Sequence, residues 1–210
     1  MRKLHFGLAA ATAGAALLSV AAVHAQGGGA PQPPGKPDPS LVTAGNYTID
    51  GGHSQVLFTY EHFGLTSNMG LASGATGTLT LDPKAPNDAK LSVDVPISSI
   101  HTTIAALDAE FQAKGWFDAA TYPTAHFEST GVAATGNSAR IAGNLTIKGI
   151  TKPAVIDATF AAAGKNPFSQ KETVSFKGTA TINRSEFSLG NAVPLVSDAV
   201  KLTITVAFEK

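Results

Sequence analysis

The sequence has no cysteine in its 210 residues, so it can form no disulfide and offers no thiol nucleophile. It also has no excess of charge, with 15 basic and 15 acidic side chains. A net charge of zero gives no excess of basic side chains to neutralise phosphate groups, which argues against nucleic acid as a partner. The fold must therefore be stabilised by an apolar core alone.

Only one long apolar run is present, and it has the form of a cleavable secretory signal. Arg2 and Lys3 give a basic start, residues 7–23 are apolar or small, and Val23-His24-Ala25 fits the small-x-small cleavage rule. The run is short and alanine-rich for a bilayer span. We expect residues 1–25 to be removed and the mature protein to be periplasmic, with 15 − 2 = 13 basic and 15 acidic side chains.

The next segment, residues 26–44, is rich in glycine and proline. Five prolines lie between Pro31 and Pro39. Such a composition predicts an extended, semi-rigid linker that buries no core of its own. The folded unit is then residues 45–210, a suitable length for one domain with one core.

Apolar and polar residues alternate with period two through most of this unit, which is typical of strands with one face buried. The last strand is the clearest, with Leu202, Ile204 and Val206 alternating with polar residues. Residues 64–77 hold several glycines and suggest a loop or a sharply curved strand. About eight strands with short connections predict an all-β, antiparallel meander, either a sandwich or a closed eight-stranded barrel.

One stretch, residues 98–118, has helical periodicity instead. Ile104, Leu107 and Phe111 recur with the spacing of one helical face, and Thr103 and Gly115 suit its two caps. One short helix in an all-β chain usually covers an edge or opening that the sheet leaves. We therefore predict a lid helix on the barrel.

The inward strand faces combine small residues with aromatic ones. The small residues are Ala125, Gly143, Ala154, Ala158, Gly178 and Ala180, and the aromatic ones are Phe58, Phe127, Phe160 and Phe176. Two interpretations stay open on this pattern. Either the small side chains leave a narrow apolar channel, or they only fit the taper of a solid barrel.

Candidate catalytic and metal-binding groups are sparse. The four mature histidines, His53, His62, His101 and His126, lack the spacing of a metal site. Asp108 and Glu110 are two residues apart on the expected helix, so they do not face each other, and we interpret both as solvated. We expect a binding protein rather than an enzyme, with no metal and no cofactor.

Five short motifs, in order, resemble the YceI-like, polyisoprenoid-binding family of secreted bacterial proteins. They are Tyr47-Thr48-Ile49-Asp50 with His53-Ser54, His62-Phe63-Gly64, Trp116-Phe117-Asp118 with Tyr122-Pro123, the run Gly143 to Pro153, and Asn183-Arg184-Ser185-Glu186-Phe187. The resemblance covers residues 47–209. It implies a lipocalin-like antiparallel barrel whose apolar tunnel holds an isoprenoid chain, such as a polyprenyl lipid or a quinone tail.

On this basis we expect a periplasmic carrier of a long-chain isoprenoid. Two alternatives remain, a quinone-linked redox partner of a membrane electron carrier and a binder of fatty-acyl amphiphiles. Transient contact with a membrane and pairing into a homodimer are also left open. The expected ligand-binding residues are Phe58, Tyr60, Ile104, Leu107, Phe111, Trp116, Phe117, Phe127, Phe160, Phe176 and Ile182.

The helix departs from the family pattern. Where the family typically has Arg-Asp-x-His-Leu-Arg, this chain has Leu107-Asp108-Ala109-Glu110-Phe111-Gln112, so only the aspartate is kept. Two basic positions and a histidine are lost. The resemblance therefore implies a less positive tunnel mouth and leaves the ligand's head group undefined.

Overall fold

A computed structural model describes residues 32–210, and ten strands form one antiparallel sheet there. The predicted signal and residues 26–31 of the predicted linker lie outside the described residues. The strands are β1 Gly45–Ile49, β2 Gln55–His62, β3 Thr66–Ser73, β4 Thr76–Leu81, β5 Lys90–Pro96, β6 Thr124–Thr135, β7 Ser138–Ile147, β8 Ile150–Lys165, β9 Glu172–Asn183 and β10 Ala199–Glu209. One α-helix, α1, spans Ala105–Gln112, and no helix in the described range is long and apolar enough to cross a bilayer.

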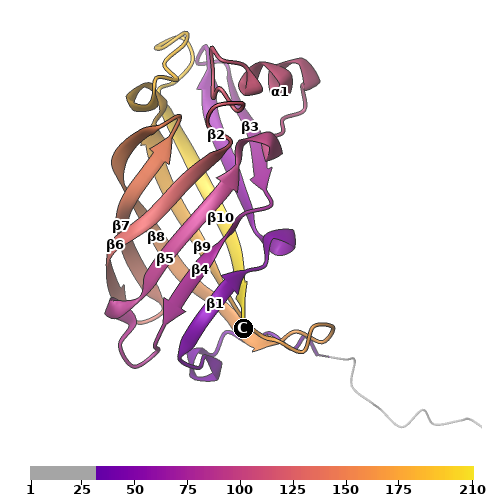
Figure 1. The fold of residues 1–210 in the computed structure, drawn as a ribbon, viewed down its shortest axis with the longest axis vertical. Helices are drawn as coiled ribbons and strands as arrows, with labels where there is room; N and C mark the ends of the chain where they lie inside the picture. The colour runs from indigo at the N-terminus through magenta and orange to yellow at the C-terminus, as the bar shows by residue number, and fades with distance from the viewer. Residues whose placement is uncertain (1–31) are drawn as a thin grey trace, which may run out of the picture. The chain divides into compact units, whose positions relative to one another are not determined.

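The sheet closes on itself as a barrel with eight strand positions, which confirms the predicted fold class (Figure 1). Two positions are each occupied by two short strands. β1 and β2 share one position, because both pair with β10, one after the other along the same edge. β4 and β3 share the next position, where β4 pairs with β1 and β3 pairs with β2. Because Ile49 of β1 pairs with Phe208 of β10, β1 and β10 leave no open sheet edge between them.

The break between β1 and β2 is held by Ser54, which is 2% exposed. Its hydroxyl donates to the carbonyl oxygen of Asp50 at 2.7 Å and accepts the N–H of Ala207 at 3.1 Å. The side chain thus satisfies a β10 backbone group that neither β1 nor β2 reaches. Residues 64–77, for which the sequence suggested a loop or a curved strand, form a tight turn followed by β3 and the start of β4.

β3 and β5 do not pair with each other, and residues 97–118, here called the lid segment, close the gap between them. β5 ends at Pro96, which has no N–H to donate. His101 then exchanges two backbone hydrogen bonds with Leu71 of β3, each 2.8 Å long. Helix α1 follows at the same end of the barrel, here called the mouth end (Figure 1). The predicted lid helix is therefore present.

The helix ends differ from those expected. Its first turn begins after Ile104 rather than at a Thr103 cap, and Ala113 rather than Gly115 is the last capping residue. Of the expected apolar stripe, Phe111 is 6% exposed, Leu107 is half-buried, and Ile104 is 52% exposed. The stripe therefore packs at its C-terminal end and opens to solvent at its start.

The opposite end of the barrel is filled by a compact apolar cluster. Tyr47 and Val174 are fully buried there together with Phe208 and Val42. Val42 belongs to the segment that the sequence assigned to the linker, and Lys36 in the same segment pairs with Ala163 of β8. Residues 36–43 therefore pack on the barrel, because an apolar side chain follows the proline-rich stretch.

Candidate binding cavity

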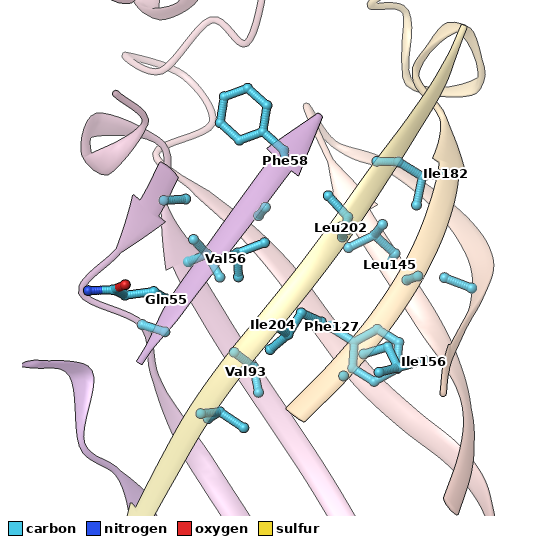
Figure 2. A pocket seen from close by; sticks show the side chains of 18 of the residues that line it. Gln55, Val56, Phe58, Val93, Phe127, Leu145, Ile156, Ile182, Leu202 and Ile204 are labelled. Carbon is cyan, nitrogen blue, oxygen red and sulfur yellow. The ribbon is translucent and has the colours of Figure 1, made fainter. Parts of the chain in front are cut away.

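A cavity of about 920 Å³ runs through the barrel between the two ends. Side chains from all eight strand positions line it, and most of them are apolar. In Figure 2, Val56, Ile204 and Phe127 come from three different strands and turn toward the same interior space. A volume of this size lies near the upper end of the roughly 300–1,000 Å³ that is typical of small-molecule sites.

The cavity explains why inward residues of the middle strands are not fully buried. Val93, Leu202 and Ile204 lie on the inner face, yet each is only half-buried. In a solid core such residues would touch neighbours on every side. Their remaining surface faces the cavity, so the interior is hollow.

Small residues on the inner face provide this space. Of the six expected from the sequence, Ala125, Ala154, Ala158, Gly178 and Ala180 line the cavity directly. Gly143 does not, because the ring of Phe127 covers it. Of the two interpretations left open by the sequence, the channel fits the structure and the solid, tapered core does not.

The structure brings all the expected ligand-binding residues to this one cavity. The lining includes Phe58, Tyr60, Ile104, Leu107, Phe111, Trp116, Phe117, Phe127, Phe160, Phe176 and Ile182. Their position on the wall is a structural observation, and their contact with a ligand stays a prediction.

At the mouth end, an aromatic group on the lid segment covers the cavity. The ring of Phe111 is 5.2 Å from that of Trp116 and 6.0 Å from that of Phe117, both edge to face. Phe58 of β2 meets Phe111 at 6.5 Å. Such contacts favour specific ring orientations, so the lid segment is fixed to β2 by the same aromatic side chains that line the cavity.

Asp108 has a structural role that sequence reasoning missed. Its Oδ1 accepts the N–H of Thr102 at 2.7 Å and the Thr102 hydroxyl at 2.6 Å. These hydrogen bonds, with a smaller contribution from His101 nearby, lower the pKa of the carboxyl group. The expectation of a solvated Asp108 is therefore wrong, because the lid segment folds back over the first turn of α1. Glu110 is exposed, as expected.

A buried cation, Arg184, closes the mouth end from the other side, and sequence reasoning missed this role as well. The residue is 7% exposed and lines the cavity. Its guanidinium donates to four backbone carbonyl oxygens of residues 189–197, here called the mouth loop, and burial lowers its pKa. Alternation along β9 could have indicated that the Arg184 side chain points inward, because Arg184 lies two residues after Ile182, which points into the barrel.

The histidines make local contacts rather than a joint site. His53 lies 2.6 Å from Asp50, and His126 lies 3.0 Å from Asp94 on the neighbouring strand. Within residues 32–210, no three histidine or acidic side chains converge in a way that could hold a metal ion.

A closed antiparallel barrel around an apolar cavity with one lidded mouth defines the lipocalin-like class of architecture. Within that class the chain belongs to the YceI-like family, because the model of the YceI-like domain matches residues 47–208. This match confirms the resemblance inferred from the motifs.

Relatives of the chain span most of its length. A UPF0312 protein of Pseudomonas syringae pv. tomato is 36% identical over 165 residues, which is 77% of this chain and 85% of that protein. Among solved structures, Burkholderia cenocepacia BcnA is 26% identical with a TM-score of 0.67, covering 76% of this chain and 98% of that chain. A polyisoprenoid binding domain from Saccharophagus degradans shares the fold at 15% identity, with a TM-score of 0.56 over 78% of this chain and 97% of that domain.

Proposed function

We propose that this protein is a non-catalytic carrier that holds a long-chain isoprenoid inside its barrel. The observation that carries the proposal is the 920 Å³ cavity with its almost continuous apolar wall. Each methylene group moved from water into such a cavity contributes about 0.8 kcal/mol. A chain of several isoprene units therefore gains enough free energy for stable binding without a covalent bond.

The length of the cavity suits a chain rather than a compact ring system. Lining residues extend along β10 from Val200 to Phe208, eight residues apart. Eight steps span roughly 27 Å along the strand, or roughly 20 Å along the barrel axis at the usual strand tilt. The family match and the fold shared with a polyisoprenoid binding domain support an isoprenoid as the chain.

The lipid itself can be identified by extraction. We expect organic extraction of the purified protein, followed by mass spectrometry, to release a prenyl lipid. A bound quinone would support the alternative of a redox partner, and a fatty acid or fatty amide would support a binder of acyl amphiphiles.

A second measurement uses the single tryptophan. Because Trp116 lines the cavity, loading of the emptied protein with a prenyl alcohol should shift its fluorescence. If no lipid can be extracted and the fluorescence stays constant on titration, the proposal of a lipid carrier is wrong.

Export to the periplasm is part of this proposal and rests on the sequence of residues 1–25. Intact-mass measurement of protein from the secreted fraction should give a chain that begins at Gln26. Retention of Met1 in membrane-bound material would contradict it.

Transient membrane contact is supported by exposed apolar residues at the mouth end. Phe63 and Leu65, at the β2–β3 turn, are 53% and 83% exposed, and the carbonyl of the exposed Leu195 accepts the N–H of Phe63. Leu65→Gln should reduce co-sedimentation with lipid vesicles. Phe168→Gln, at the opposite end of the barrel, removes an even more exposed apolar side chain and should have no effect. Equal losses in the two variants would contradict contact through the mouth.

A further inference from the structure

Three features of the mouth end indicate what kind of head group the cavity accepts. The first is the direction in which two polar side chains point. Inward residues of β9 have even numbers, among them Phe176, Ala180 and Ile182, and this parity continues to Arg184. On β2 the same holds for Val56, Phe58 and Tyr60. Tyr60 and Arg184 are therefore polar groups on the inner face, at the end where the apolar wall stops.

The second feature is that Arg184 forms no direct ion pair within the described residues. Asp198 acts on it only through space, because the Asp198 carboxylate accepts hydrogen bonds from Ser185 instead. A guanidinium has five N–H donors, and Arg184 uses four of them. Nε donates to Ser197 at 2.8 Å, Nη1 to Leu189 and to Asn191, and Nη2 to Val196 at 2.8 Å. One Nη2 hydrogen remains. None of the ion pairs within residues 32–210 includes Arg184, and a buried cation with a free donor favours an acceptor oxygen.

The third feature concerns Tyr60, whose hydroxyl makes no hydrogen bond within the described residues. The hydroxyl of Tyr47, by comparison, lies within hydrogen-bonding distance of two acceptors. Tyr60 lies near Arg184, because Val196, which accepts from Nη2, also forms a β-bridge with His62 at the end of β2. Tyr60 differs from Tyr122, whose hydroxyl also forms no hydrogen bond within residues 32–210 but which does not line the cavity. An acceptor oxygen inside the cavity can therefore pair with the Tyr60 hydroxyl.

We propose that Tyr60 and Arg184 form a head-group site, in which both donate hydrogen bonds to one oxygen of a long-chain amphiphile. The site takes a carbonyl, carboxylate or hydroxyl oxygen at the end of an apolar chain. It disfavours a pure hydrocarbon, which leaves both donors unpaired, and a cationic head, which Arg184 repels. The chain then extends from the mouth end toward Phe160 and Phe176. This inference rests on the proposed lipid-carrier function and adds the orientation and the chemistry of the head.

The test compares two ligands with the same branched chain, the alcohol phytol and the hydrocarbon phytane. The dissociation constants of both are measured with the parent protein, with Tyr60→Phe, and with Tyr122→Phe as control. Tyr122 is half-buried but does not line the cavity. Within each protein, the dissociation constant for phytol is divided by that for phytane. Comparing this ratio between proteins cancels the difference in solubility of the two ligands. Arg184 is left unchanged, because its removal would leave four backbone carbonyl groups of the mouth loop without their donor.

We expect Tyr60→Phe to weaken phytol binding about threefold to tenfold, the effect of one hydrogen bond, while phytane binding stays constant. Tyr122→Phe should change neither. If Tyr60→Phe leaves the ratio unchanged, the head-group site is wrong, although the tunnel can still bind lipid. If neither ligand binds the parent protein, the carrier function and the head-group site both fail.

Infrared spectroscopy gives a second readout that does not depend on affinity. An isoprenoid methyl ketone bound to the parent protein should show a carbonyl band at lower frequency than in hexane, because Arg184 and Tyr60 donate to its oxygen. Tyr60→Phe should move the band part of the way back. A band at the hexane position in the parent protein would overturn the proposal.

Discussion

The ring of Phe127 on β6 lies against Gly143 on β7, where any side chain would overlap with it. A Cβ atom on Gly143 would collide with the ring and would stand 2.5 Å from the carbonyl oxygen of Glu128. Phe58 lies in the same way against Gly70 on β3. In both pairs the missing side chain lets an aromatic ring lie close to the barrel wall. The rings thus form the surface of the cavity without filling it.

Gly143→Ala should therefore displace the Phe127 ring and destabilise the protein by about 1–3 kcal/mol, as overpacking does. Gly131 on the same hairpin is the matched control, because nothing lies within 4 Å of the Cβ position there. Gly131→Ala should change the free energy of unfolding by less than about 0.5 kcal/mol. Urea unfolding of both variants gives the comparison, and equal values would contradict the proposed packing.

Ala180→Phe tests whether the interior space is used by a ligand. The new ring points into the cavity, so it should compete with a lipid chain while creating little strain. We expect prenyl-lipid uptake to fall at least tenfold, and the free energy of unfolding of the lipid-free protein to change by less than about 1 kcal/mol.

The control for this variant is Thr179→Phe, which adds a comparable ring to the exposed outer face one residue away. Uptake by Thr179→Phe should match that of the parent protein. Strong destabilisation of Ala180→Phe with unchanged uptake would mean that the ligand does not occupy this part of the barrel.

Much of the barrel could be predicted from alternation alone. The inward residues of β9 and β10 were readable because each strand keeps strict period two over many residues. The cavity itself was only one of two interpretations, because an alanine such as Ala158 can leave a space or fit beneath a larger neighbour. Deciding between them requires the positions of rings on adjacent strands, which the sequence of one strand does not contain.

The parts that sequence reasoning missed depend on contacts between distant segments. The role of Ser54 depends on the register of β10, more than 150 positions away. The hydrogen bonds of Asp108 depend on the path of residues 101–104 before the helix. Arg184 stood within a recognised motif, but its partners are carbonyl groups of the mouth loop, and backbone acceptors have no sequence signature.

Asp108→Asn should loosen the start of the lid segment. The substitution keeps the size of the side chain but replaces a charged acceptor, which holds the N–H and hydroxyl of Thr102, by a weaker neutral one. Hydrogen exchange at the amides of residues 102–104 should become faster, and lipid release should accelerate. Glu110→Gln alters an exposed carboxylate on the same helix that holds no group of Thr102, and it should leave the exchange of these amides unchanged. Identical exchange in the two variants would show that Asp108 does not hold the segment.

The last prediction concerns the end of the barrel opposite the mouth, where Tyr47 is fully buried. Its hydroxyl lies 2.5 Å from the carbonyl oxygen of Thr43 and 2.6 Å from Oε1 of Glu172. Burial, with the nearby Glu172 carboxylate, raises the pKa of Tyr47 to about 12. Burial opposes the charged form of Glu172, but hydrogen bonds from Tyr47 and Thr43 outweigh this effect and lower the pKa of its carboxyl group.

The sign of the pH dependence follows from these two shifts. Because the pKa of Tyr47 is higher in the folded protein than its ordinary value of 10.0, its contribution to stability is complete below pH 10 and is lost as the pH rises toward 12. The slope should reach about 1.4 kcal/mol for each pH unit in that window. Glu172 acts in the opposite direction. Because its pKa is lowered in the folded protein, its contribution to stability is present above its ordinary pKa of 4.5 and is lost as the pH falls below that value.

We expect Tyr47→Phe to lose the alkaline slope. At neutral pH it should lower the free energy of unfolding by about 1–3 kcal/mol, because Glu172 and Thr43 lose a hydrogen-bonding partner. Tyr122→Phe removes a tyrosine hydroxyl that forms no hydrogen bond within residues 32–210, and it should keep the slope of the parent protein. Urea unfolding between pH 7 and pH 12 separates these outcomes. If the parent protein and Tyr47→Phe lose stability in parallel above pH 10, the alkaline transition belongs to other groups. The hydrogen-bonded cluster at Tyr47 would then contribute to packing but not to the pH dependence of the fold.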